Sequence, residues 1–182
     1  DILVSSNLER LLFLLSRDPA YVAELMRQLR EDGVYQLSDR LLAQLKQDFS
    51  CGCCDDKGAA DVIGRLWREQ HYLCDPHTAV AYAAAQNLRG ENPVLIASTA
   101  HWAKFGDNVY RAIHGIEPSG ELPADVTALT GCELNKLIAE ETGKHHIPAG
   151  LANLDTMQVR FTEVIDNDVE AIEDAAEAFL TR

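Results

Sequence analysis

The segment Glu91–Thr99, with the sequence ENPVLIAST, constrains the fold more than any other part of the chain. Its apolar run, Val94–Ala97, follows a proline-containing turn and stops at the two hydroxyl side chains Ser98 and Thr99. A short apolar run after a turn predicts a buried β-strand. A helical pattern follows and ends at Gly115, and this order predicts an α/β fold with a mostly parallel sheet. Because ligands in open sheets bind beyond the carboxyl ends of the strands, we expect the hydroxyls to face a ligand site.

The rest of the chain predicts many helices and few strands. Apolar residues recur at helical spacing between capping residues and glycines. Helices are expected after Ser5–Asn7, from Pro19 to Gly33, after Ser38, and over residues 61–70, 76–90, 100–115, 131–143 and 166–180. Two more strands are expected at Ile2–Val4 and at residues 158–165. A sheet with so few strands indicates that residues 1–182 form one helix-rich fragment of a larger α/β protein.

Composition excludes several classes of partner. The chain is 47% hydrophobic and 25% charged, as in an ordinary globular protein, and its net charge is −13. A surface this acidic repels nucleic acid and anionic membranes, so neither is an expected partner. No apolar run approaches a membrane span, and no secretion signal is recognisable. Three of the five cysteines fall within four positions, which favours a reducing compartment, and we expect a cytoplasmic location.

Two short segments hold candidate site residues. In the first, Asp75 is a predicted N-cap, Pro76 occupies the first helical position, and His77 and Thr78 lie in the first turn. The first turn of a helix favours anions, which makes His77 a candidate near an anionic group, although such a histidine is more often a surface residue. In the second segment, Thr99 either caps the helix expected from residue 100 or presents its hydroxyl to a ligand.

Three segments together resemble the threonine synthase family of fold type II pyridoxal-phosphate enzymes. They are Ser6-Asn7-Leu8-Glu9-Arg10, Asp75-Pro76-His77-Thr78-Ala79-Val80 and Thr99-Ala100-His101-Trp102-Ala103-Lys104-Phe105. They occur in the order of the family motifs and near the family spacings. Trp102 stands where the family usually has proline, which we expect to alter the start of the following helix.

The resemblance implies a specific reaction. The family converts O-phospho-L-homoserine and water to L-threonine and phosphate, and pyridoxal 5'-phosphate acts as the electron sink. Thr99 matches the hydroxyl residue that faces the pyridine nitrogen, and Ser98 beside it is a second cofactor-binding candidate. Asn7, Arg10 and His77 are the expected substrate-proximal residues. Among them Arg10 suits the substrate's phosphate group, because an arginine can pair bidentately with phosphate.

The resemblance also implies that essential parts lie elsewhere. In the family, the Schiff-base lysine belongs to a serine-phenylalanine-lysine-aspartate motif, and both it and the glycine-rich phosphate loop precede these segments. None of the five lysines here stands in such a motif, and Lys104 alone is expected near the site. We therefore expect the C-terminal portion of a longer enzyme, without catalytic residues of its own and inactive in isolation.

Other functions compete with this prediction. Cys51, Cys53 and Cys54, with His71, offer metal donors, although C-x-C-C is not a zinc-finger spacing and we expect no metal. Cys74 or Cys132 paired with a histidine would make a thiol nucleophile. A freestanding, non-catalytic binding module is the remaining alternative. Apolar surface left open by missing strands would favour self-association.

Overall fold

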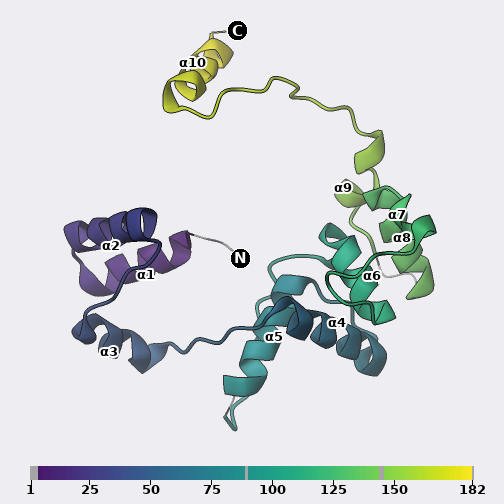
Figure 1. Ribbon diagram of the computed structural model, residues 1–182, viewed down its shortest axis with the longest axis horizontal. Helices are drawn as coiled ribbons and strands as arrows, with labels where there is room; N and C mark the ends of the chain where they lie inside the picture. The colour runs from purple at the N-terminus through teal and green to yellow at the C-terminus, as the bar shows by residue number, and fades with distance from the viewer. Residues whose placement is uncertain (1–3, 89, 144–145, 182) are drawn as a thin grey trace. The chain divides into compact units, whose positions relative to one another are not determined.

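The structure is a computed structural model, and it describes residues 4–88, 90–143 and 146–181. Within them the secondary structure is helical (Figure 1). The α-helices are α1 Ser6–Ser16, α2 Pro19–Asp32, α3 Asp39–Asp48, α4 Asp56–Gln70, α5 Pro76–Leu88, α6 Gly106–His114, α7 Ala124–Thr127, α8 Gly131–Glu141, α9 Ala149–Ala152 and α10 Val169–Leu180. Two 3₁₀ helices are η1 Trp102–Lys104 and η2 Leu154–Thr156.

The helix ends follow local capping rules. Ser5, Asp18 and Ser38 accept hydrogen bonds from backbone amides at the starts of α1, α2 and α3, as their sequences predict. Gly33 and Gly115 end α2 and α6 in the left-handed conformation that glycine adopts without strain. The predicted helix ends at these positions are therefore confirmed.

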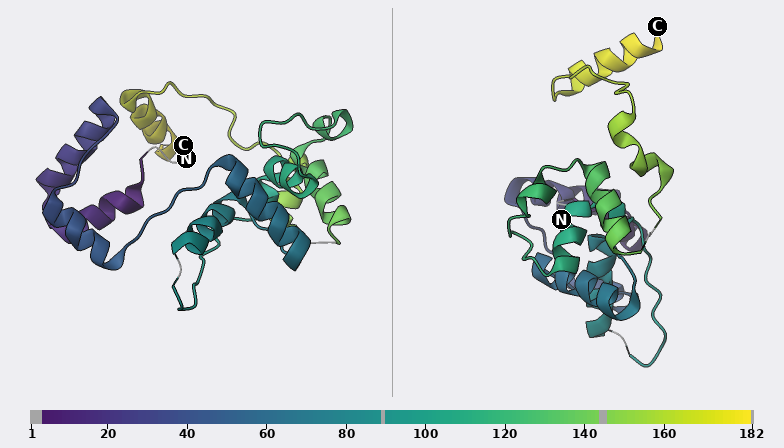
Figure 2. Two further views of the ribbon diagram at one scale, coloured as in Figure 1. Left: turned by 60° about the horizontal axis from the view of Figure 1, so that its bottom comes forward. Right: turned by 90° about the vertical axis from the view of Figure 1, so that its right-hand side faces the viewer.

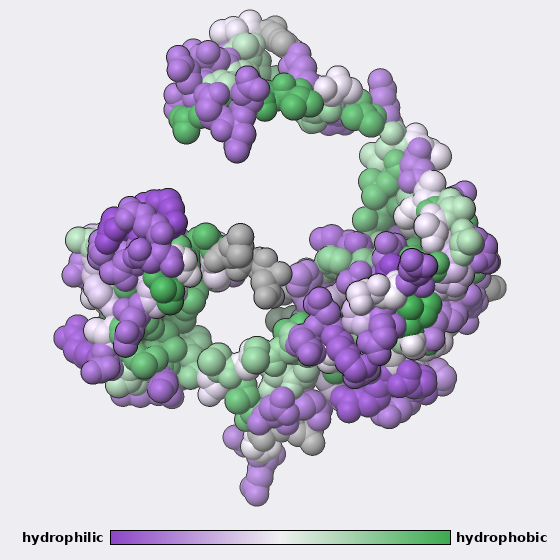
Figure 3. All heavy atoms as spheres, in the orientation of Figure 1, coloured by the Kyte–Doolittle hydropathy of each residue, from purple (hydrophilic) through white to green (hydrophobic). Residues whose placement is uncertain are grey.

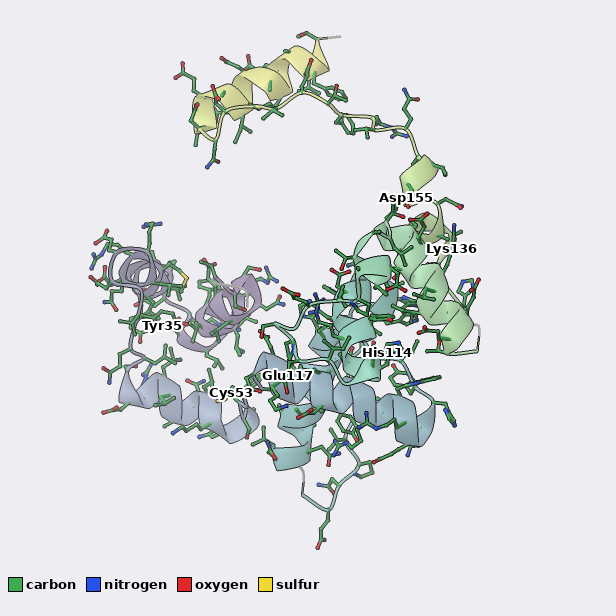
Figure 4. The ribbon with its side chains drawn as sticks, turned by 45° about the vertical axis from the view of Figure 1, so that its right-hand side comes forward. Tyr35, Cys53, His114, Glu117, Lys136 and Asp155 are labelled. Atoms are coloured by element: carbon green, nitrogen blue, oxygen red, sulfur yellow. The ribbon has the colours of Figure 1, made fainter. Side chains whose placement is uncertain are left out.

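The chain divides into two compact units, the first of which contains residues 1–55 and 80–96. In this unit α1, α2 and α3 enclose a small core (Figure 2). Its fully buried residues are Leu12, Val22, Leu25 and Leu41. Tyr35, labelled in Figure 4, packs against this core from the segment between α2 and α3.

The second unit contains residues 56–79 and 97–182, and its core forms where α4 packs against α6. Gly64 permits this contact, because a Cβ atom there would lie 2.6 Å from the carbonyl oxygen of Ala112 on α6. Helix α8 covers another side of α6. The buried apolar residues of these three helices are Ala59, Val62, Ile63, Leu66, Val109, Tyr110, Ala112, Cys132, Leu134 and Ile138.

The strand predictions are wrong where the structure describes the chain. Residues 94–99 and 158–165 are irregular, and except for the half-buried Ile96 they are also exposed: Leu95 is 97% and Val164 98% exposed. A β-strand exists only through hydrogen bonds to a neighbouring strand, and no described segment pairs with either of these. The predicted strand Ile2–Val4 falls largely outside the described residues.

The expected parallel sheet is therefore missing from the described part of the chain, which is the helix-rich component alone. Hydrophobic atoms lie on the surface along the segment between η2 and α10 (Figure 3). Among the described residues, no helix is both long enough and apolar enough to span a bilayer.

Candidate functional site

Asp75 organises the start of α5. Its side chain is 1% exposed, and Oδ1 accepts hydrogen bonds from the amides of His77 at 2.9 Å and Thr78 at 3.1 Å. These bonds satisfy amides that have no partner within the helix, and the helix dipole favours the negative charge. The predicted N-cap role of Asp75 is confirmed, so the first turn of α5 already holds an anion supplied by the protein itself.

The second oxygen of Asp75 connects α5 to the segment that precedes η1. Oδ2 accepts a hydrogen bond from the hydroxyl of Thr78 at 2.5 Å, and Thr78 Oγ1 lies 3.1 Å from Ser98 Oγ. Ser98 is 20 residues further along the chain and is exposed, whereas Asp75 and Thr78 are buried. A buried charge is thus linked through two hydroxyls to the surface beside Thr99.

Thr99 does not cap a helix. The helix expected from residue 100 starts later, because η1 begins at Trp102 and α6 begins at Gly106. His101 is the N-cap of η1, where its Nδ1 accepts a hydrogen bond from the amide of Ala103 at 3.2 Å. The expectation of a helix from residue 100 is wrong, and the exposed hydroxyl of Thr99 has no capping role that would explain its position.

Trp102 is buried at the start of η1. Its indole is 4% exposed, and Asn135 on α8 donates a hydrogen bond from Nδ2 to the carbonyl of Ala103 at 2.7 Å. Burial of the indole and the bond from α8 fix η1 as a separate turn ahead of α6. Lys104 lies on η1 with an exposed side chain.

A cavity of about 290 Å³ lies beside Ser98. Its lining includes the histidines His101 and His146 together with Asp75 and Trp102. Burial lowers the pKa of His101, the charge of His146 adds to this effect, and the charge of Asp75 opposes it. The imidazole is therefore neutral at pH 7, with its Nδ1 lone pair used by the Ala103 amide.

The other predicted residues lie in different surroundings. His77 is exposed, and its ring contacts that of Phe105 edge-on with the centroids 5.1 Å apart. Asn7 and Arg10 lie in the first unit, on one face of α1, where the guanidinium of Arg10 donates a hydrogen bond to Asn7 Oδ1. Both are exposed.

The buried cysteines are unsuited to nucleophilic catalysis. Burial raises the pKa of Cys74 to about 11, and the neighbouring charge of Asp75 adds to the rise. Cys132 is also buried, with its thiol donating to the carbonyl of Leu151 at 3.2 Å. A thiol at such a pKa is almost fully protonated at pH 7, which argues against Cys74 as a nucleophile.

The cysteine-rich loop offers no assembled metal site. Cys53, labelled in Figure 4, lies with Cys51 and Cys54 between α3 and α4. In the parts of the chain described by the structure, no three His, Cys, Asp or Glu side chains come together in a way that would hold a metal ion. Gly52 in this loop approaches α5 closely, since a Cβ there would lie 2.9 Å from Ala84 Cβ.

Comparison with known structures defines the class of protein. The crystal structure titled "PLP bound Threonine synthase from Brucella melitensis" superposes with a TM-score of 0.56 at 34% identity, covering 76% of this chain and 32% of that one. This similarity is consistent with a helix-rich part of a fold type II pyridoxal-phosphate enzyme. The family model "Threonine synthase, C-terminal" matches residues 78–175, and the chain belongs to the threonine synthase family.

Curated relatives agree with this assignment. Threonine synthase from Pseudomonas aeruginosa is 35% identical over 132 residues, which are 71% of this chain and 28% of that protein. Human "Threonine synthase-like 1" is 36% identical over 115 residues, which are 62% of this chain and 16% of that protein. The chain thus spans less than a third of the length of these two relatives.

The sequence does not mark Asp75 and Thr78 as residues of a shared site. It predicts Asp75 as a cap and places Thr78 in the first helical turn. Their spacing of three residues across a helix start is a signal that they share a hydrogen bond. Their link to Ser98, 20 residues away, has no counterpart in the local sequence.

Proposed function

We propose that this chain is the C-terminal part of a threonine synthase that converts O-phospho-L-homoserine and water to L-threonine and phosphate. The observation that carries the proposal is the hydrogen-bonded series Asp75–Thr78–Ser98, which ends beside Thr99 in a chain of this family. Threonine synthases use pyridoxal phosphate, and we propose the same cofactor here.

The residues near Ser98 fit such a cofactor. A pyridine nitrogen that stays unprotonated accepts a hydrogen bond from a neutral donor, and Thr99 offers an exposed hydroxyl that is not used as a cap. When bound, pyridoxal phosphate supplies an electron sink for elimination and replacement chemistry. In the proposed site Thr99 contacts the ring nitrogen without forcing a proton onto it, and Ser98 lies next to this contact.

We propose Asn7 and Arg10 of the first unit, and separately His77 of the second unit, as substrate-proximal residues. Arg10, held by Asn7, supplies a cation for a phosphate group, and His77 lies at the exposed start of α5. Because Asp75 already occupies the amides of that helix start, His77 contributes through its ring and not through the helix dipole. The lysine that binds the cofactor covalently is proposed to lie outside these 182 residues.

The proposed function is tested by comparing the activity of the 182-residue chain with that of a longer product of the same reading frame. The reading frame upstream of the codon for Asp1 is sequenced, and both the 182-residue chain and the longer product are purified and incubated with pyridoxal phosphate and O-phospho-L-homoserine. We expect phosphate and L-threonine from the longer product only. Phosphate release by the 182 residues alone overturns the proposed inactivity. An upstream frame that is closed by a stop codon, or a longer product without activity, favours a non-catalytic binding module.

The proposal extends to location and assembly. We propose a cytoplasmic location, because the odd number and close clustering of the cysteines in the sequence do not suit a disulfide framework. We also propose that the isolated chain self-associates, because Leu95, Phe161 and Val164 expose large apolar side chains. Sedimentation velocity at increasing concentration tests this: Phe161→Glu should reduce association, whereas Thr162→Glu, which adds the same charge beside it but removes no apolar surface, should reduce it less.

A further inference from the structure

The carboxylate of Asp75 fixes the direction of the Thr78 hydroxyl proton. The ionised carboxylate of Asp75 is an acceptor only, so the proton of Thr78 Oγ1, 2.5 Å from Oδ2, is donated to it. Thr78 Oγ1 then accepts from Ser98 across 3.1 Å. The alternative acceptor for the Ser98 proton is the carbonyl of Ala100 at 3.5 Å. In either case the proton of Ser98 is used within the protein.

Asp75 uses its two oxygens for different tasks. Oδ1 caps α5 through the amides of His77 and Thr78, and Oδ2 receives the hydroxyl of Thr78. Capping alone needs only Oδ1. The second oxygen accepts from Thr78, whose hydroxyl also lies within hydrogen-bond distance of Ser98, an exposed residue outside the helix.

We propose that Asp75 and Thr78 are positioning residues that hold Ser98 with its proton directed inward, so that Ser98 fixes the backbone that presents Thr99 to a bound group. The inference rests on the proposed function for the identity of the bound group, a pyridine ring. The two neighbouring hydroxyls then have different roles. Thr99 donates a hydrogen bond to the ring nitrogen, and Ser98 holds the backbone of Thr99 in position.

Because Oδ1 and Oδ2 of Asp75 accept different hydrogen bonds, a single substitution can remove the hydroxyl link and keep the backbone bonds. Thr78→Val removes the hydroxyl link and keeps both backbone bonds to Oδ1. Asp75→Asn keeps an acceptor for the cap but places an amide donor toward Thr78, which reverses the direction of the hydroxyl protons. Ser98→Ala cuts the link at its exposed end and leaves the hydrogen bonds of Asp75 in place.

The first experiment measures backbone order in the 182-residue chain. Amide ¹⁵N relaxation gives backbone order parameters for residues 98, 99 and 100. We expect values of about 0.85 in the unaltered chain and values below about 0.6 in Thr78→Val and Ser98→Ala. Thr78→Ser restores the hydroxyl and should restore the order. Thr127→Val is the matched control, because the hydroxyl of Thr127 donates to the nearby carbonyls of Leu122 and Pro123, far from residues 98–100 in the sequence.

The outcomes are decisive in both directions. Loss of order at residues 98–100 in Thr78→Val and Ser98→Ala, with recovery in Thr78→Ser, supports the inference. If Thr78→Val does not fold, Ser98→Ala decides alone. Unchanged order in Ser98→Ala, or low order already present in the unaltered chain, overturns it.

The second experiment separates this inference from the proposed function. Binding of pyridoxal phosphate to the longer product is titrated by absorbance, and Thr78→Val should weaken it by about fivefold, the effect of losing one hydrogen bond. If the longer product binds no pyridoxal phosphate, the proposed function fails, while the order parameters still decide whether Asp75 and Thr78 position Ser98. Undiminished binding in a Thr78→Val variant that has lost order overturns the link to the cofactor.

Discussion

The hydroxyl oxygen of Thr78 lies 2.5 Å from Oδ2 of Asp75, in the interior of the second unit. Both residues are buried, and Asp75 is 1% exposed. A carboxylate is costly to bury unless its oxygens accept hydrogen bonds, and this one accepts three. The start of α5 is therefore stabilised by a charged group that is fully committed to its own helix.

Removing that carboxylate should destabilise the second unit. Asp75→Ala loses the cap and the bond to Thr78, and we expect a fall of about 2–3 kcal/mol in the free energy of unfolding. Asp75→Asn keeps the cap acceptor and should cost about 1 kcal/mol. Both tryptophans, Trp67 and Trp102, lie in this unit, so urea unfolding followed by tryptophan fluorescence reports on it.

Asp107→Ala is the control for these variants. Asp107 is exposed in the first turn of α6, and its removal should change the stability by no more than about 0.5 kcal/mol. An equal loss in Asp107→Ala and Asp75→Ala would show that burial of the carboxylate is irrelevant.

Gly64 sets how closely α4 and α6 approach. A Cβ atom at Gly64 would lie 2.6 Å from the backbone oxygen of Ala112, which cannot move without displacing α6. Gly64→Ala should lower the free energy of unfolding by about 1–3 kcal/mol in spite of the higher helix propensity of alanine. In contrast, a Cβ at Gly131 meets nothing within 4 Å, so Gly131→Ala should be neutral or stabilising. Chemical denaturation of both variants tests the contact, and equal behaviour would contradict it.

The cysteines should differ in reactivity. With a pKa of about 11, only about one Cys74 thiol in a thousand is ionised at pH 8, and the side chain is buried as well. Cys51 and Cys53 are exposed. Alkylation of the native chain at pH 8, followed by peptide mass analysis, should modify these two first and Cys74 only after denaturation. Labelling of Cys74 at the rate of Cys53 would disprove its protection.

Acidification should destabilise the second unit through His101. Because burial lowers its pKa in the folded state, the unfolded chain binds a proton first as the pH falls below about 6.5. Stability is thus present above this pH and is lost as the pH falls toward the lowered pKa. His101→Asn keeps a capping side chain and cannot titrate, so its melting temperature should fall less between pH 7 and pH 5. Parallel pH profiles of the two proteins would refute this assignment.

The resemblance carried by three short motifs led to the correct family, although the sheet predicted from the same sequence is not present in the described residues. The motif residues Asp75, His77 and Ser98 are recognisable because their identities and spacings are local. Val94–Ala97 has the composition of a buried strand, but its conformation depends on partners that the segment does not contain.

The sequence by itself determined the ends of the helices. Ser5, Asp18 and Ser38 form their capping bonds with amides three residues away, and Thr130 with Glu133 forms a capping box at the start of α8. Such contacts lie within one turn of chain, so their physics is complete in a few residues.

Only the tertiary structure decided what surrounds the hydroxyl of Ser98. The approach of Thr78 to Ser98 joins a helix start to a segment 20 residues later, and Asn135 on α8 holds Ala103 across a separation of 32 residues. These contacts depend on the packing of α4, α6 and α8 around Gly64 and Gly106, where a side chain would collide with a neighbour. A residue's partners across such distances are set by the shape of the packed core, which is a property of the whole unit and not of any one segment.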